Sequence, residues 1–143
     1  MLKYKLPRSD ELYVLMYTDE IEAYGRALVP HFLGVYPLDK MPSHICIPSR
    51  LIVNTDTHNL KGEHWLAVSY EHSGIIYAFD PLGFYYPKLL VERLHRLPHR
   101  RIIYNRKAYQ MPWENTCGQH CLNFLYKQSK ENATLVNHHH EFA

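Results

Sequence analysis

The chain has 143 residues, of which 46% are hydrophobic and 21% are charged, and its formal net charge is +2 with histidine counted as neutral. Twelve Tyr, five Phe and two Trp give more apolar surface than a disordered chain carries. No apolar run approaches the roughly 20 residues that cross a bilayer. We therefore expect no membrane association and one folded domain over 1–143, with poorly defined ends at 1–17 and 129–143.

The cysteine content indicates a reducing compartment. Cys46, Cys117 and Cys121 are an odd and small set, which suits a reactive thiol better than a disulfide framework. The N-terminal segment has positive charge but lacks the apolar stretch of a secretory signal. We therefore expect a location inside a cell.

The first predicted element is a helix that opens at Thr18, where a hydroxyl and two carboxylates offer acceptors to the free N–H groups of a first turn. Ile21, Tyr24 and Leu28 recur at helical spacing. Pro30 ends the run.

Short β-like segments follow the helix. Phe32–Tyr36 predicts an edge strand, and Arg50–Asn54 predicts a strand that begins after a proline. Trp65–Tyr70 and Ile75–Phe79 flank a short polar segment with glycine, which is typical of a β-hairpin.

The last third adds a helix over Pro87–Leu97, a strand over Arg101–Tyr104 and an apolar-striped helix over 117–128. Helices around a run of antiparallel strands predict an α+β domain with a central, mainly antiparallel sheet flanked by helices. Cys117 would then stand at the N-terminus of a core helix.

A cysteine at a helix N-terminus is a candidate nucleophile, because the N–H dipoles there favour the thiolate. Cys117 has this position, and Gly118 after it would let a substrate approach the backbone closely. Cys121 lies one turn further on the same face, and we read it and Cys46 as core residues.

A thiol nucleophile needs a base, and the predicted hairpin supplies one. His64 precedes one strand and Asp80 follows its partner, so antiparallel pairing puts both at one end of the sheet. Asp80 would orient the imidazole, which would take the proton of Cys117. The Cys117 N–H and the Gln110 side chain are candidate donors to an oxyanion.

These residues resemble the adenovirus maturation protease (adenain) family, whose clan includes the SUMO-specific and ubiquitin-like proteases. The motifs occur in the family's order from about residue 20 to residue 125. They are His31–Tyr36, Ile52–Thr55, Gly62–Trp65, Phe79–Phe84, and Gln110 followed by Cys117-Gly118.

The resemblance implies a papain-like cysteine protease with a His64–Asp80–Cys117 triad and Gln110 in the oxyanion hole. Trp65 would line a narrow groove, because the family cleaves next to glycine. The implied substrates are precursor proteins of a virus or virus-like element. No cofactor is required, although an activating peptide or DNA remains open.

The sequence departs from adenain in three places. Asp80 stands where adenain has Glu, and the segment from there to Gln110 is shorter. The chain also ends soon after the nucleophile helix, so we expect it to lack substrate-binding helices of adenain. No cysteine lies between Asp80 and Gln110, so we do not expect adenain's disulfide-linked activating peptide.

Three other interpretations remain open. The same triad would serve a deconjugating protease that removes ubiquitin or SUMO-like modifiers, which a C-terminally electrophilic modifier would trap. A non-catalytic binding relative would lack an activated thiol. A basic run also suggests a DNA or polyanion partner, through Arg93, Arg96, Arg100 and Arg101.

The adjacent histidines 138–140 do not suit a metal site.

Overall fold

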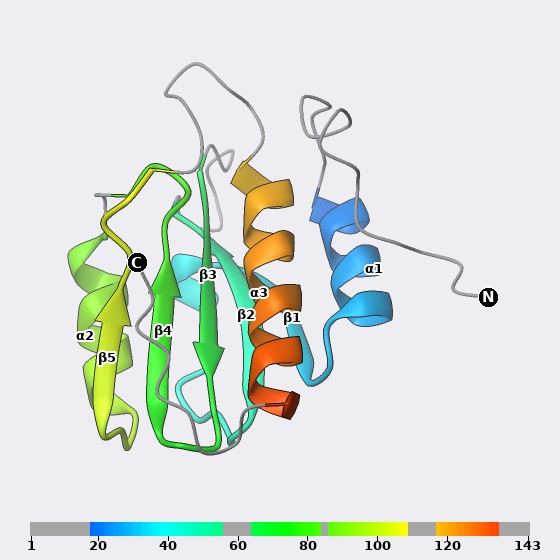
Figure 1. Ribbon diagram of the computed structural model, residues 1–143. Helices are drawn as coiled ribbons and strands as arrows, with labels where there is room; N and C mark the ends of the chain where they lie inside the picture. Colours follow the sequence, from blue (N-terminus) through cyan, green and yellow to red (C-terminus); the bar gives the residue numbers. More distant parts are fainter. Residues whose placement is uncertain (1–17, 56–63, 84–85, 109–116, 135–143) are drawn as a thin grey trace.

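A computed structural model describes residues 18–55, 64–83, 86–108 and 117–134 of the chain (Figure 1). One five-stranded sheet, with its strands in chain order, forms the centre. The strands are β1 (Phe32–Pro37), β2 (Ser49–Asn54), β3 (Trp65–Tyr70), β4 (Ile75–Phe79) and β5 (Arg101–Tyr104).

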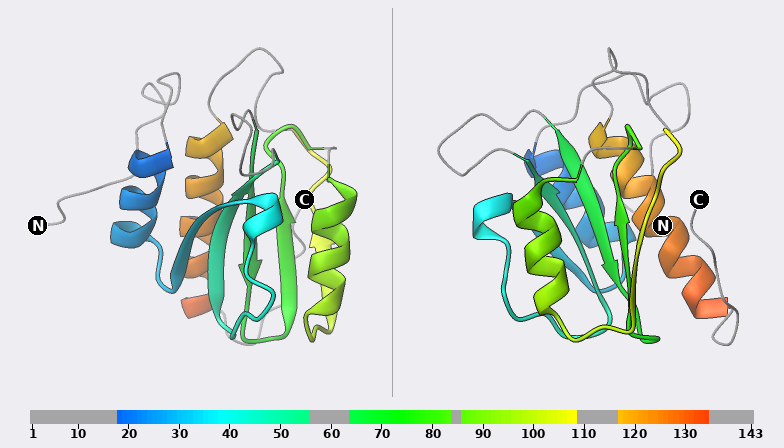
Figure 2. Two further views of the ribbon diagram at one scale, coloured as in Figure 1. Left: turned by 180° about the vertical axis from the view of Figure 1, so that it is seen from behind. Right: turned by 90° about the vertical axis from the view of Figure 1, so that its left-hand side faces the viewer.

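Helices cover both faces of the sheet, giving a three-layered α+β fold (Figure 2). Helices α1 and α3 lie on one face, and α2 lies on the other with the short 3₁₀ helix η2. Their bounds are α1 (Thr18–Leu28), η2 (Leu38–Lys40), α2 (Lys88–Arg96) and α3 (Cys117–Thr134). None of these described helices is long and apolar enough to span a bilayer.

The pairing of the strands is mixed. The central strand β3 pairs antiparallel with β2 and with β4, and the second of these pairs is the predicted hairpin. Both outer strands pair in parallel, β1 with β2 and β5 with β4. The second parallel pair is a strand–helix–strand unit, since α2 carries the chain from β4 back to the start of β5.

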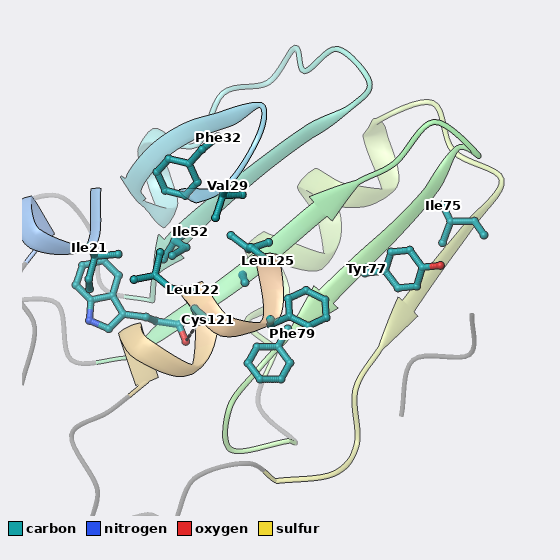
Figure 3. Close-up of a cluster of buried hydrophobic side chains, with 13 residues drawn as sticks. Ile21, Val29, Phe32, Ile52, Ile75, Tyr77, Phe79, Cys121, Leu122 and Leu125 are labelled. Atoms are coloured by element: carbon teal, nitrogen blue, oxygen red, sulfur yellow. Dashed lines mark hydrogen bonds between the residues drawn. The ribbon is translucent and has the colours of Figure 1, made fainter. Parts of the chain in front are cut away.

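Every residue of β3 and β4 is buried, because the sheet is covered on both faces. Alternate side chains enter two separate cores. Trp65 and Ala67 pack with α1 and α3 in the cluster that Figure 3 shows, whereas Leu66 and Val68 pack with α2 and η2.

The structure corrects two predictions, one about Cys46 and one about the end of the last helix. Cys121 is buried as predicted, but the core assignment of Cys46 was wrong, since this residue is exposed in the connection between η2 and β2. Helix α3 also continues to Thr134, beyond the predicted end at 128. Burial of Gln128 and Ser129 explains the extension, because both pack although they are polar.

Candidate active site

The sheet brings His64 and Asp80 together at one of its ends. His64 directly precedes β3 and Asp80 directly follows β4, and these strands are antiparallel. The imidazole Nε2 lies 2.6 Å from Asp80 Oδ1. Asp80 is fully buried, while the His64 side chain keeps 15% of its surface exposed. The predicted pairing of these side chains is therefore confirmed.

When Asp80 is ionised, its contact with His64 determines which nitrogen of the ring carries a proton. An ionised carboxylate can only accept, so Nε2–H of His64 donates to Asp80. The main chain at His64 is fixed as well, because its carbonyl accepts a hydrogen bond of 2.9 Å from the Thr55 N–H. This arrangement holds the imidazole in one tautomer and one orientation.

A tight turn follows Asp80 and helps to hold the carboxylate. Asp80 Oδ1 accepts the Leu82 N–H at 3.0 Å, and the Asp80 carbonyl accepts the Gly83 N–H at 2.8 Å. Gly83 has a φ of +82°, and a Cβ there would lie 2.7 Å from the Ala108 nitrogen. Only glycine suits this close, left-handed position.

Helix α3 begins at Cys117, where the backbone N–H dipoles of the first turn create a partial positive charge. Gly118 allows the helix to come close to α1, since a Cβ on this residue would lie 2.5 Å from Ile21 Cδ1. The same Cβ would lie 4.0 Å from Trp65 Cδ1. The first turn of α3 therefore packs beside the first residue of β3.

Contacts further along α3 fix its direction over the sheet. Cys121 Sγ donates to the Trp65 carbonyl at 3.4 Å, and the ring of Phe124 stacks on Phe79 with centroids 4.6 Å apart. The helix thus begins at the end of the sheet where His64 and Asp80 lie (Figure 1).

The structure does not show the roles predicted for the other site residues. Gln110 and the side chain of Cys117 lie outside the described part of the chain. Trp65 is 8% exposed and belongs to a hydrophobic cluster, and Gly118 is buried. The structure gives both a packing role, and their contact with a substrate stays a prediction, as do the catalytic roles.

Sequence reasoning missed two polar residues that contact Asp80. The Asn105 carboxamide is fully buried and accepts the Asp80 N–H at 2.7 Å. The Tyr86 hydroxyl lies 3.2 Å from the same nitrogen. Asn105 directly follows β5, and the parallel pairing of β4 with β5 places it beside Asp80, so a prediction of that pairing would have identified Asn105. No sequence pattern indicates a role for Tyr86.

The hydroxyl of Tyr86 stays protonated over the ordinary pH range. Burial raises the pKa of Tyr86 well above its ordinary value of 10.0, and the negative charge of Asp80 raises it further. The group can therefore donate one hydrogen bond while accepting others.

Comparison with known proteins agrees with this geometry. Residues 32–142 match the model of a family described as adenovirus endoprotease. The chain belongs to the adenovirus endoprotease family. It is 34% identical over 126 residues to the "Protease" of Porcine adenovirus A serotype 3, and 31% identical over 117 residues to that of Bovine adenovirus C serotype 10.

These alignments cover 75% and 68% of this chain, but 61% and 57% of the two viral proteins. The chain thus matches less than two thirds of either relative's length. Among the described residues, no group of three or more His, Cys, Asp or Glu side chains could hold a metal ion.

Proposed function

We propose that this protein is a cysteine endopeptidase that cleaves precursor proteins of a virus or virus-like element at glycine-containing sites. The observation that carries the proposal is the buried Asp80 carboxylate bonded to a partly exposed His64, at the end of the sheet where the Cys117 helix begins. Membership of the adenovirus endoprotease family supports it. The proposed place of action is the infected cell, its nucleus or cytoplasm, or the virion.

In the proposed reaction, Nδ1 of His64 takes the thiol proton of Cys117. The thiolate attacks the scissile carbonyl, the C–N bond breaks, and the imidazolium returns its proton to the leaving amine. Water, deprotonated by the same imidazole, then hydrolyses the thioester. Asp80 retains its negative charge throughout and stabilises the imidazolium through Nε2–H.

The proposed oxyanion donors are the Cys117 N–H and the Gln110 side chain. A donor aimed at the developing charge contributes about 100- to 1,000-fold in rate. The N-terminus of α3 favours the thiolate of Cys117, because the helix dipole stabilises negative charge. We propose that Trp65 and Gly118 border the groove in which a glycine of the substrate binds.

Replacing Cys117 with Ala tests the proposal against a glycine-containing peptide reporter. We expect kcat/KM to fall by more than about 1,000-fold, because no other group forms the thioester. Cys46→Ala is the matched control, since this exposed thiol lies outside the site and its loss should leave turnover unchanged. Circular dichroism checks the fold of both variants.

Unchanged turnover in Cys117→Ala would reject the nucleophile and favour a non-catalytic binding relative. Incubation with ubiquitin or SUMO carrying a C-terminal electrophile tests the deconjugating alternative. A covalent adduct at Cys117, together with failure to cleave viral precursor proteins, would replace the proposed substrate class by modified host proteins.

We also propose that DNA or another polyanion binds near β5, through Arg96, Arg100 and Arg101, which are exposed. Arg93 is removed from this set, because it is only partly exposed and its guanidinium donates to the Met41 carbonyl at 2.8 Å. Affinity for duplex DNA should fall steeply with salt concentration, since each neutralised phosphate releases counterions. Binding that is absent or independent of salt would reject this surface.

A further inference from the structure

The main chain at Asp80 lies beyond the regular ladder of the sheet. The last residue pair between β3 and β4 is Ala67 with Phe79, and the last pair between β4 and β5 is Ala78 with Tyr104. Asp80 follows both pairs, so it lies one residue beyond the last residues of β4 that pair with β3 and β5. Its backbone N–H and C=O must find other partners, because the residue is fully buried.

Asn105 supplies such partners from the end of the neighbouring strand. Its Oδ1 accepts the Asp80 N–H at 2.7 Å, and its Nδ2 donates to the Asp80 carbonyl at 2.7 Å. One carboxamide thus binds both polar groups of the Asp80 main chain, as a further strand residue would. The Asn105 N–H also donates to the Ala78 carbonyl at 3.3 Å, which fixes the amide against β4.

The Tyr86 hydroxyl completes the arrangement. It lies 3.2 Å from the Asp80 nitrogen, 3.2 Å from the Ala78 carbonyl and 3.0 Å from the Asn105 carbonyl, and it also contacts Oδ1 of Asn105. One hydroxyl therefore joins the end of β4, the residue that carries the carboxylate and the residue that follows β5.

We propose that Tyr86 and Asn105 are positioning residues, which hold the main chain of Asp80 so that its carboxylate meets Nε2 of His64. Their effect on catalysis rests on the proposed function, whereas their effect on the His64–Asp80 hydrogen bond does not. The bond is 2.6 Å long, so a small displacement of the Asp80 main chain would lengthen it and release the imidazole.

The same carboxamide reaches a second part of the site. Asn105 Nδ2 donates to the Lys107 carbonyl at 3.0 Å, and Gly83 of the Asp80 turn packs against the Lys107–Ala108 peptide. Residues 105–108 lead in sequence to Gln110, the proposed oxyanion donor. Asn105 thus couples the turn that carries the carboxylate to the segment that precedes this donor.

Tyr86→Phe tests the proposal, with Tyr104→Phe as its matched control. The two rings pack edge to face with centroids 4.8 Å apart, and the Tyr104 hydroxyl is buried without a hydrogen-bond partner among the described residues. Each variant therefore loses one hydroxyl from one of two rings in contact. Only the Tyr86 hydroxyl touches Asp80.

Two readouts apply to each variant. We expect kcat for Tyr86→Phe to fall on the order of tenfold or more with KM little changed, because misplacement of a catalytic group slows the chemical step. We also expect the proton NMR resonance of the His64 Nε2–H, which reports its hydrogen bond to Asp80, to move upfield or to broaden. Tyr104→Phe should leave both readouts as in the wild type.

A folded Tyr86→Phe protein with wild-type kcat and an unchanged His64 resonance would overturn the proposal, as would equal effects in Tyr104→Phe. If Tyr86→Phe does not fold, Asn105→Ser is judged by the same two readouts and the same criteria. Should the wild-type protein cleave no reporter, the resonance alone decides whether these residues position Asp80. The experiment can therefore reject the positioning role of Tyr86 and Asn105 without rejecting the proposed protease activity, and the reverse.

Discussion

The two ends of the sheet each contain a buried carboxylate with a basic partner, and the partners differ in chemistry, since arginine keeps its proton and histidine can exchange one, and in exposure. At the end where β3 stops, Arg50 and Glu71 are 5% and 1% exposed, so the ion pair is sealed on both sides. At the end where β3 begins, Asp80 is fully buried but His64 remains 15% exposed. A pair whose basic member reaches solvent can exchange a proton with a substrate, whereas a sealed pair can only hold structure.

The sealed pair joins three parts of the fold. Arg50 makes two hydrogen bonds to Glu71, of 2.9 Å from Nε and 2.6 Å from Nη2, and Ser69 donates a further one to the same carboxylate. Arg50 Nη1 also donates to the Pro30 carbonyl at 2.9 Å. These bonds tie β2 and β3 to the connection between α1 and β1, and they satisfy both oxygens of the carboxylate.

The largest expected effect separates the two ends by activity. Asp80→Asn should lower kcat by about 1,000- to 10,000-fold, because an amide cannot stabilise the imidazolium or hold the correct tautomer. Glu71→Gln removes the same charge at the sealed end and should leave kcat per folded molecule unchanged. Steady-state kinetics on protein titrated for its folded fraction measures both.

That comparison has a clear way to fail. If Glu71→Gln lowers kcat as much as Asp80→Asn does, the two ends are not functionally distinct. The exposure of His64 would then not be the feature that decides which pair does chemistry.

The second expected effect separates the ends by stability. Glu71→Gln should lower the free energy of unfolding by about 3–5 kcal/mol, since it leaves the buried Arg50 charge without its partner. Chemical denaturation followed by fluorescence measures this loss. Glu92→Gln is the matched control, because the exposed Lys88–Glu92 pair should contribute less than about 1 kcal/mol.

A loss for Glu71→Gln no larger than that for Glu92→Gln would show that the sealed pair is not a structural link. A double change to Arg50→Met with Glu71→Leu should recover part of the loss, because it removes the unpaired Arg50 charge but leaves the buried Ser69 hydroxyl without its acceptor.

Much of the fold follows from local patterns in the sequence. The hairpin strands β3 and β4 and the strand β5 have the predicted bounds, and α1 begins at Thr18 as its acceptor-rich start indicates. The His64–Asp80 contact followed from antiparallel pairing alone. Local periodicity and one rule of strand geometry were sufficient for these features.

Other features depend on contacts between distant segments, which no local pattern encodes. The sequence predicts a mainly antiparallel sheet but not that both outer strands pair in parallel, because their direction depends on where the chain crosses the sheet. Asn105 reaches Asp80 because β5 runs parallel to β4. The end of α3 was placed too early, because packing buries Gln128 and Ser129.

The smallest expected effect concerns packing at the end where α3 begins. Gly118→Ala would put a methyl carbon 2.5 Å from Ile21 Cδ1, closer than two non-bonded carbon atoms can approach. Ile21 is fully buried. We expect a loss of about 1–3 kcal/mol in the free energy of unfolding, as is usual when a close-packed core gains a methyl group. Thermal and chemical denaturation measure it.

Ile21→Val removes the Cδ1 atom with which the new methyl group clashes, so the double variant should be more stable than Gly118→Ala alone. Ile21→Val by itself should cost about 0.5–1.5 kcal/mol, which makes the recovery a coupling between the two residues and not a general gain. Strictly additive losses would mean that α3 can move away from α1. The start of α3 would then be held beside β3 by other contacts, such as the hydrogen bond from Cys121 to the Trp65 carbonyl.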